Sequence, residues 1–126
     1  MKKVLIIDDD PDVLENLKLI LSEKGFEIDT LTSPSELYFR ILSFDPHIIL
    51  LDVNLDNSDG RNICKGLKNH FRTTNIPVIL FSGEHNLKDH YKECMAEDFF
   101  EKPLDITKLV DRLNEFFSTP PHKMSA

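Results

Sequence analysis

The sequence predicts an α/β protein built on a doubly wound, five-stranded parallel sheet with helices on both faces. Short runs of Val, Ile and Leu alternate five times with segments of helical periodicity, a pattern typical of successive βα units. Residues 4–7 and 48–51 are continuously apolar, as expected for strands that are buried on both faces. Each of these two runs ends abruptly in aspartate.

Length and charge restrict the possible classes of protein. A chain of 126 residues fits one compact domain, predicted here over residues 1–118 with a flexible tail over residues 119–126. The net charge of −7 argues against a direct nucleic-acid surface, and no apolar stretch is long enough for membrane insertion. Cys64 and Cys94 lack metal-ligand spacing and are expected to be reduced thiols, so we predict a cytoplasmic protein.

Five strands are predicted from runs of apolar and β-branched residues, each of which has turn-forming residues at its ends. They cover residues 4–7, 26–31, 47–51, 78–81 and 98–100. The first helix starts at Pro11, with Asp10 as its cap, and stops at Gly25. The second has a capped start over residues 33–36, with Pro34 at the first helical position.

The other helices are predicted from apolar residues at helical spacing, and the fourth has the weakest pattern. The expected buried positions of the second to fifth helices are Leu37, Ile41 and Leu42; Ile63, Leu67 and Phe71; Leu87, Tyr91, Cys94 and Met95; and Ile106, Leu109, Val110, Leu113, Phe116 and Phe117.

Polar side chains stand where four of the predicted strands end. Asp8 and Asp9 follow the first strand, Asp52 the third, Ser82 the fourth and Lys102 the fifth. The carboxyl ends of parallel strands share one edge of the sheet, where ligands bind in such folds. Carboxylates gathered there repel one another unless a cation or protons are bound. The sequence therefore predicts an acidic, metal-binding site.

Each of these residue types has a separable chemical role. Asp9 and Asp52 can offer hard oxygen ligands to Mg²⁺, and Asp8 can hold one of the waters that the ion keeps. Asp52 can also attack an activated phosphoryl group, because an ionised carboxylate needs no separate base. Lys102 and the Ser82 hydroxyl can then interact with the phosphoryl oxygens.

With these residues in this order, the chain resembles the receiver domain of bacterial-type response regulators, the phosphoacceptor half of two-component signalling, from Lys2 to about Phe117. The resemblance implies a flavodoxin-like fold with strand order 2-1-3-4-5 and phosphorylation of Asp52. It also implies a Mg²⁺ site formed by Asp8, Asp9, Asp52 and the backbone carbonyl of Asn54.

The resemblance assigns further roles. Lys102 matches the lysine before a cis-proline, Ser82 the hydroxyl switch and Phe99 the switch aromatic. Asn54 and Glu84 match positions that tune autodephosphorylation, and the chemotaxis response regulator has the same pair, so we expect a fairly short-lived phosphoryl state. The implied donor is a sensor histidine kinase or phosphotransfer protein, and the implied output is a protein contact through the fourth helix, fifth strand and fifth helix.

Three features depart from the family pattern. Asp56 stands where many receivers have proline, which is expected to loosen that loop and to add negative charge near the site. Met95 replaces a usual glycine, so either the backbone avoids a left-handed conformation there or Met95 is strained. The interval from Ser82 to Lys102 is about two residues shorter than is typical.

Two other functional interpretations of the sequence stay open. A receiver-like interaction module would never accept phosphate, although such degenerate members commonly lose a marker residue that is present here. A haloacid-dehalogenase-like phosphatase would use Asp8 as nucleophile, with Asp8 and Asp10 imitating its Asp-x-Asp signature. Against that reading, Pro11 replaces the expected glycine and Asp52 has no role. The receiver reading makes the chain a signalling phosphoacceptor that catalyses only its own phosphorylation and dephosphorylation.

Overall fold

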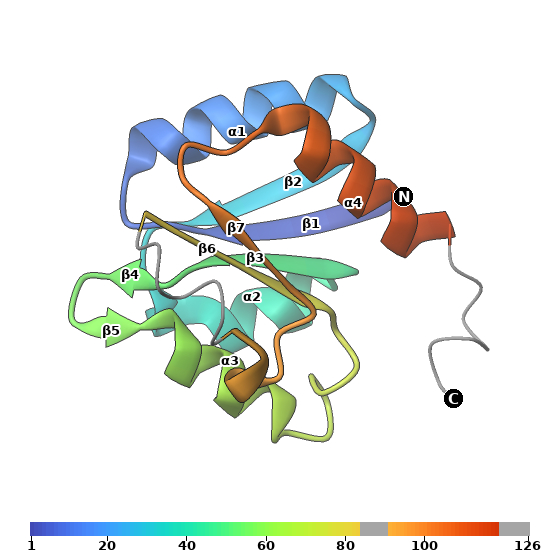
Figure 1. Ribbon diagram of the computed structural model, residues 1–126. Helices are drawn as coiled ribbons and strands as arrows, with labels where there is room; N and C mark the ends of the chain where they lie inside the picture. Colours follow the sequence, from blue (N-terminus) through green and yellow to red (C-terminus); the bar gives the residue numbers. More distant parts are fainter. Residues whose placement is uncertain (84–90, 119–126) are drawn as a thin grey trace.

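The computed structural model describes residues 1–83 and 91–118 (Figure 1). Its main sheet has five parallel strands in the order β2-β1-β3-β6-β7. These strands are β1 (Lys2–Ile7), β2 (Phe26–Leu31), β3 (Ile48–Asp52), β6 (Val78–Ser82) and β7 (Asp98–Glu101). Numbered within this sheet alone, the order is 2-1-3-4-5, so the predicted fold class is confirmed.

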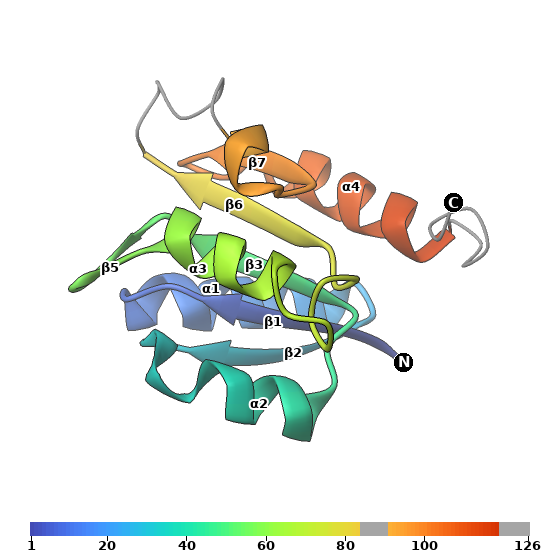
Figure 2. The ribbon, with the colours of Figure 1, turned by 90° about the horizontal axis from the view of Figure 1, so that it is seen from below.

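Helices cover both faces of the sheet (Figures 1 and 2). The helices α1 (Pro11–Glu23) and α4 (Ile106–Ser118) lie on one face, and α2 (Leu37–Phe44) and α3 (Gly60–Lys68) lie on the other. Among the described residues, no helix combines the length and the apolar character that crossing a bilayer requires.

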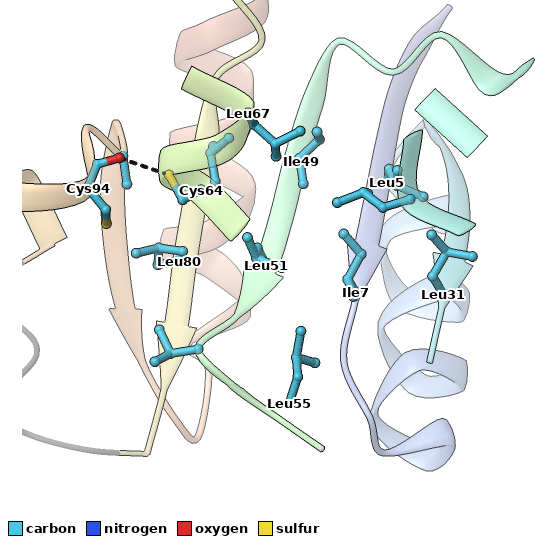
Figure 3. Close-up of a cluster of buried hydrophobic side chains, with 14 of the residues drawn as sticks. Leu5, Ile7, Leu31, Ile49, Leu51, Leu55, Cys64, Leu67, Leu80 and Cys94 are labelled. Atoms are coloured by element: carbon cyan, nitrogen blue, oxygen red, sulfur yellow. Dashed lines mark hydrogen bonds between the residues drawn. The ribbon is translucent and has the colours of Figure 1, made fainter. Parts of the chain in front are cut away.

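The alternation of side chains along β1 separates two hydrophobic cores. Leu5 and Ile7 point towards α2 and α3, whereas Val4 and Ile6 point towards α1 and α4. Successive side chains of a strand face opposite sides of a sheet, so a strand buried on both faces must be apolar at every position. Figure 3 shows the first of these cores.

Both cysteines belong to the core on the α3 side. They are free thiols, as predicted, and Cys64 Sγ donates to the backbone oxygen of Cys94 at 3.2 Å (Figure 3). The interaction with Cys94 and burial both raise the pKa of the Cys64 thiol, so it stays protonated and packs as a small apolar side chain.

Aspartate caps start the two helices that flank the carboxyl edge of the sheet. The Asp10 side chain accepts a hydrogen bond from the backbone N–H of Asp12 at 3.0 Å, and Asp59 accepts one from Arg61 at 2.9 Å. Such caps satisfy N–H groups that have no partner within the helix. The predicted role of Asp10 as a cap is therefore confirmed.

Three of the expected buried positions are wrong, and one of them, Met95, is 46% exposed. The Leu42 side chain is 69% exposed, because the buried face of α2 consists of Leu37 and Ile41. The Phe71 side chain is 79% exposed, because α3 ends at Lys68 and the chain turns before Phe71 can join the buried face.

The region of the predicted fourth helix has only a short 3₁₀ helix, η3 (Tyr91–Cys94), among its described residues. The other predicted position of this helix, Leu87, lies outside the described residues. Directly after η3, Met95 adopts a left-handed backbone conformation with φ 67°. Of the two alternatives raised for Met95, the structure therefore shows the strained one.

Met95→Gly is expected to raise the free energy of unfolding by about 0.5–1 kcal/mol. A left-handed conformation costs a residue with a Cβ about 1–2 kcal/mol, which exceeds the extra backbone entropy that glycine loses on folding. Chemical denaturation of both proteins measures the change. Met95→Ala is the control, since it keeps the Cβ and should give no gain; an equal gain for alanine would contradict the strain argument.

The segment after Asp52, predicted as a loop, contains an additional hairpin. Its strands β4 (Asn54–Leu55) and β5 (Ser58–Asp59) pair antiparallel around Asp56 and Asn57. Asn57 has φ 60°, a conformation that asparagine tolerates better than most residues. The exposed Asp56 thus occupies a hairpin turn, and this hairpin lies beside the carboxyl edge of the sheet (Figure 1).

Candidate functional site

Asp52 is the last residue of a strand that is buried along its whole length. Its register places it beside Phe81 of β6, one residue before Ser82, and the neighbouring strand β1 ends at Ile7, directly before Asp8. The side chains of Asp8 and Asp52 are buried, with residues 0% and 1% exposed. Two carboxylates therefore meet at the point where the sheet order reverses.

The structure brings three carboxylates and a lysine together at this edge. Carboxylate oxygens of Asp8, Asp9 and Asp52 lie within 4.8 Å of one another. Lys102, which follows β7, places its Nζ 3.1 Å from Asp8 Oδ2 and 3.1 Å from Asp52 Oδ2. The same Nζ lies 5.2 Å from the centroid of the Phe81 ring, whose face attracts a cation. One ammonium group thus bridges the two buried acids.

Burial dominates the electrostatics of Asp52. Loss of hydration raises its pKa from 3.8 to about 6, and the charge of Asp8 adds to the rise. Hydrogen bonds from the backbone of Asn54 and from Lys102 oppose it. Burial by itself lowers the pKa of Lys102, but its hydrogen bonds and charge contacts with Asp52 and Asp8 raise it overall. At neutral pH the site holds a poorly hydrated Asp52 carboxylate beside a protonated lysine.

Backbone turns hold both buried acids in position. Asp8 Oδ1 accepts from the N–H of Asp10 at 2.9 Å, and Asp52 Oδ1 accepts from the N–H of Asn54 at 3.1 Å. The second oxygen of each carboxylate faces Lys102. The Asp8 turn continues directly into the capped start of α1, so secondary structure determines the position of this side chain.

Asn54 links β4 to the end of β6. Its side-chain Nδ2 donates to Ser82 Oγ at 3.1 Å, and Ser82 is fully buried. Sequence reasoning assigned the Asn54 carbonyl to the metal and its side chain to dephosphorylation, and it missed this amide–hydroxyl contact. The position of Asn54 two residues after Asp52 indicated that it lies near the site. Its contact with Ser82, however, depends on the packing of β3 against β6.

Gly60 is a second feature that sequence reasoning missed. A Cβ at this position would lie 2.2 Å from the backbone oxygen of Asp52 and 2.8 Å from Val53 Cα. The Gly60 N–H donates to Val53 O at 2.8 Å, so the start of α3 rests against the backbone that carries Asp52. A glycine directly after a helix cap was the signal in the sequence, although capping alone does not require glycine there.

The donor set fits a hard divalent cation. Three carboxylates that converge from two chain segments supply anionic oxygens, which Mg²⁺ prefers over nitrogen or sulfur ligands. The half-buried Asp9 leaves room for the waters that this ion keeps. The residues present therefore fit a magnesium site.

Of the remaining predicted site residues, the structure describes Phe99 but not Glu84. Phe99 is 8% exposed and packs in the core on the α3 side, and the Lys102–Pro103 peptide bond is cis, as the resemblance implied. Glu84 lies outside the described residues. Among the described residues, the structure thus places Asp8, Asp9 and Asp52 with Lys102 at the edge of the sheet, and it places Phe99 in the core.

The fold and this edge define a class of protein: doubly wound α/β domains with an acidic site at the switch point of the sheet. A family model described as "Response regulator receiver domain" matches residues 4–114, and the chain belongs to this family.

Relatives and solved structures agree with this assignment. The chain is 31% identical over 114 residues to the phosphate regulon transcriptional regulatory protein PhoB of Pseudomonas aeruginosa, covering 89% of this chain and 50% of PhoB. It is 27% identical over 115 residues to the DNA-binding dual master transcriptional regulator RpaA of Synechocystis, covering 90% of this chain and 48% of RpaA. The chain thus spans about half the length of these relatives.

A crystal structure of a two-component response regulator from Clostridium difficile has a TM-score of 0.83 and 28% identity, covering 93% of this chain and 96% of that chain. The response regulator TrrA of Thermotoga maritima, whose structure holds Mg²⁺ and BeF, has a TM-score of 0.81 at 23% identity, covering 92% of this chain and 99% of that chain. The second likeness supports the fold alone.

Proposed function

We propose that this chain accepts a phosphoryl group on Asp52 from a phosphohistidine of a sensor histidine kinase or phosphotransfer protein. The observation that carries the proposal is the buried Asp52 carboxylate, which Lys102 bridges to Asp8 beside Asp9. This geometry unites a nucleophile with fixed positive charge in a poorly hydrated site, which is the combination that phosphoryl transfer needs.

The transfer needs no proton from the nucleophile. A carboxylate oxygen of Asp52 forms the new O–P bond while the P–N bond of phosphohistidine breaks, and its electron pair goes to the imidazole nitrogen. Above pH 6 Asp52 is mainly ionised, because its pKa is about 6. Lys102 Nζ, 3.1 Å from Asp52 Oδ2, is positioned to stabilise negative charge on the transferred group.

Asp8, Asp9, Asp52 and the backbone carbonyl of Asn54 would hold Mg²⁺. When bound, the ion supplies positive charge to the phosphoryl oxygens and offsets the repulsion among the carboxylates. The chain's own residues keep these oxygens in place through the turns that begin at Asp8 and Asp52.

Ser82 and Phe99 are proposed to convert phosphorylation into a change of surface. A phosphoryl group on Asp52 offers acceptor oxygens to the Ser82 hydroxyl, which now accepts from Asn54 Nδ2. Ser82 lies at the end of β6, next to β7, which carries Phe99, so its movement would change the packing of that ring. Asn54 and Glu84 are proposed to tune the rate at which the phosphoryl group is lost.

The output is proposed to be a protein contact at β7 and α4. A pocket of about 320 Å³ lies there, lined by residues that include Phe99, Phe100 and Lys108. We propose a receiver domain over residues 1–118; the tail predicted over residues 119–126 lies outside the described residues. This domain works in the cytoplasm, does not bind nucleic acid directly and catalyses only its own phosphorylation and dephosphorylation.

Incubation with acetyl phosphate and Mg²⁺, followed by intact mass measurement, tests the proposal. The native protein should gain one phosphoryl group, and Asp52→Asn should gain none, because an amide is not a nucleophile towards phosphorus. Removing Mg²⁺ with a chelator should reduce the adduct by at least about tenfold. Rapid quenching is needed, because we expect a short phosphoryl lifetime.

Asp56→Asn is the matched control, since it removes the same charge from an exposed residue of the adjacent hairpin and should keep the adduct. No adduct on the quenched native protein would contradict the proposal in favour of a phosphorylation-independent module. An adduct that persists in Asp52→Asn and is lost in Asp8→Asn would instead place the nucleophile at Asp8, as the phosphatase reading requires.

A further inference from the structure

Exposed apolar side chains gather on the face of the molecule that carries α2 and α3. Of the seven large apolar side chains that are exposed among the described residues, four belong to α2 or to the turn after α3. These four are Tyr38, Phe39, Leu42 and Phe71, and their exposed fractions range from 50% to 79%. Exposure of this size at adjoining positions marks interaction surfaces more often than scattered apolar residues do.

Tyr38, Leu42 and Phe71 line one groove. It has a volume of about 280 Å³ and lies between α2 and the turn over residues 70–73. Tyr38 also borders a second depression of about 430 Å³, which extends to Ser58 and Asp59 of β5. The groove between α2 and the turn is called here the α2/α3 groove. It shares no lining residue with the pocket at β7 and α4, and Figure 2 shows α2 and α4 on opposite sides of the sheet.

The exposed rings are held by contacts with one another. The Phe71 ring stacks on His70 with centroids 5.1 Å apart, and Tyr38 meets His70 at 6.1 Å. The Arg72 guanidinium lies over the Phe71 ring, 5.4 Å from its centroid. A ring that is already ordered loses little conformational entropy when a partner covers it, so this arrangement suits binding.

The charge of the α2/α3 groove is opposite to that of the whole chain. Residues 60–75 include four Arg and Lys residues and no Asp or Glu, although the net charge of the chain is −7; two of the four, Arg61 and Lys68, already pair with Asp59 and Glu97. Among the described residues that line the groove, Arg72 carries the only full charge, and no described carboxylate forms an ion pair with it. The groove therefore complements an apolar segment that carries negative charge.

A second copy of the chain is a poor occupant. A symmetric contact between two α2/α3 grooves would bring Arg72 of one copy towards Arg72 of the other, and like charges at an interface are unfavourable. A nucleic acid would meet an apolar groove that has a single full positive charge, in an acidic protein.

We propose that the α2/α3 groove binds an amphipathic, acidic peptide segment of a partner protein. The segment places aromatic or aliphatic side chains against Tyr38, Leu42 and Phe71, and a carboxylate against the Arg72 guanidinium. This contact depends on the fold and on the groove alone, so it does not require phosphorylation of Asp52.

Selection from a phage-displayed library of random dodecapeptides tests the proposal with the unphosphorylated full chain as bait. Counter-selection uses the double variant Phe71→Ser/Arg72→Glu. Both side chains are exposed, so the fold should persist, and circular dichroism checks this. The enriched peptides should carry aromatic or aliphatic residues together with Asp or Glu. Their dissociation constants should rise by about tenfold or more in the double variant, as expected when an aromatic and an arginine anchor are lost.

Leu19→Ser/Lys18→Glu is the matched control, because it removes an exposed apolar side chain and reverses one charge on α1, and binding should not change. Replacing the acidic residues of a selected peptide with Asn and Gln should weaken its binding. The proposal fails if no enriched peptide depends on the groove, or if the dependent peptides are basic. It also fails if sedimentation shows a dimer of the native chain that Phe71→Ser abolishes, since the occupant would then be a second copy.

Discussion

Asp52→Asn is expected to raise the free energy of unfolding of the metal-free protein at pH 7.5 by about 2 kcal/mol. Burial raises the pKa of Asp52 from 3.8 to about 6, so the folded protein holds an ionised carboxylate that has lost much of its hydration. Each unit of pKa is worth about 1.36 kcal/mol, which sets about 3 kcal/mol as the upper bound of the gain. Asparagine has the shape of the neutral acid, and its amide oxygen can still accept a hydrogen bond from Lys102 Nζ.

The stability difference between Asp52→Asn and the native protein is expected to increase with pH. Because the pKa is raised in the folded state, the stability that Asp52 contributes is fully present below pH 4 and is lost as the pH rises through 6. The difference between variant and native protein should therefore be small at pH 4 and reach its maximum above pH 6. Urea denaturation in the presence of a chelator, repeated across this pH range, measures it.

Asp56→Asn serves as the control for charge, since Asp56 is exposed in the adjacent hairpin turn and its replacement should change stability by less than about 0.5 kcal/mol. Added Mg²⁺ should stabilise the native protein more than Asp52→Asn and so narrow the difference. A variant that is less stable than the native protein at every pH would show that burial of the carboxylate does not control the stability of this site.

Gly60→Ala is expected to lower the free energy of unfolding by about 2–4 kcal/mol. A Cβ at Gly60 would lie 2.2 Å from Asp52 O and 2.8 Å from Val53 Cα, and both are backbone atoms that cannot rotate away. Overpacking against fixed atoms forces the backbone to shift. Because this backbone carries Asp52, the yield of the phosphoryl adduct should fall as well.

Gly66→Ala is a matched control within the same helix. A Cβ at Gly66 would lie 3.6 Å from the Tyr38 hydroxyl, an ordinary contact, and alanine is favoured over glycine in a helix by about 1 kcal/mol. Chemical denaturation should therefore show opposite signs for the two substitutions. A small or stabilising effect of Gly60→Ala would mean that the start of α3 can move away from Asp52 at little cost.

Much of the fold could be predicted because a parallel strand that is buried on both sides must be apolar at every position, and this is visible in the sequence. The runs over residues 4–7 and 48–51, which form the buried parts of β1 and β3, are apolar at every position, and an aspartate follows each of them. The less reliable predictions concerned surface positions. Leu42 and Phe71 fit helical spacing, but whether a helix continues, and which side it buries, depends on neighbours that spacing does not specify.

The sequence by itself determined the class of fold, the family and the set of charged residues at the carboxyl edge. These follow from local rules: hydrophobic periodicity, helix caps and the sharp change from apolar to acidic residues at the strand ends. Only the tertiary structure decided which of those groups touch. The bridge from Lys102 to Asp8 and Asp52 joins residues 94 and 50 positions apart, and the contact from Asn54 to Ser82 spans 28. Such contacts, like the close approach of Gly60 to Asp52 and the α2/α3 groove, arise when separate elements pack together, and no periodicity within one element encodes them.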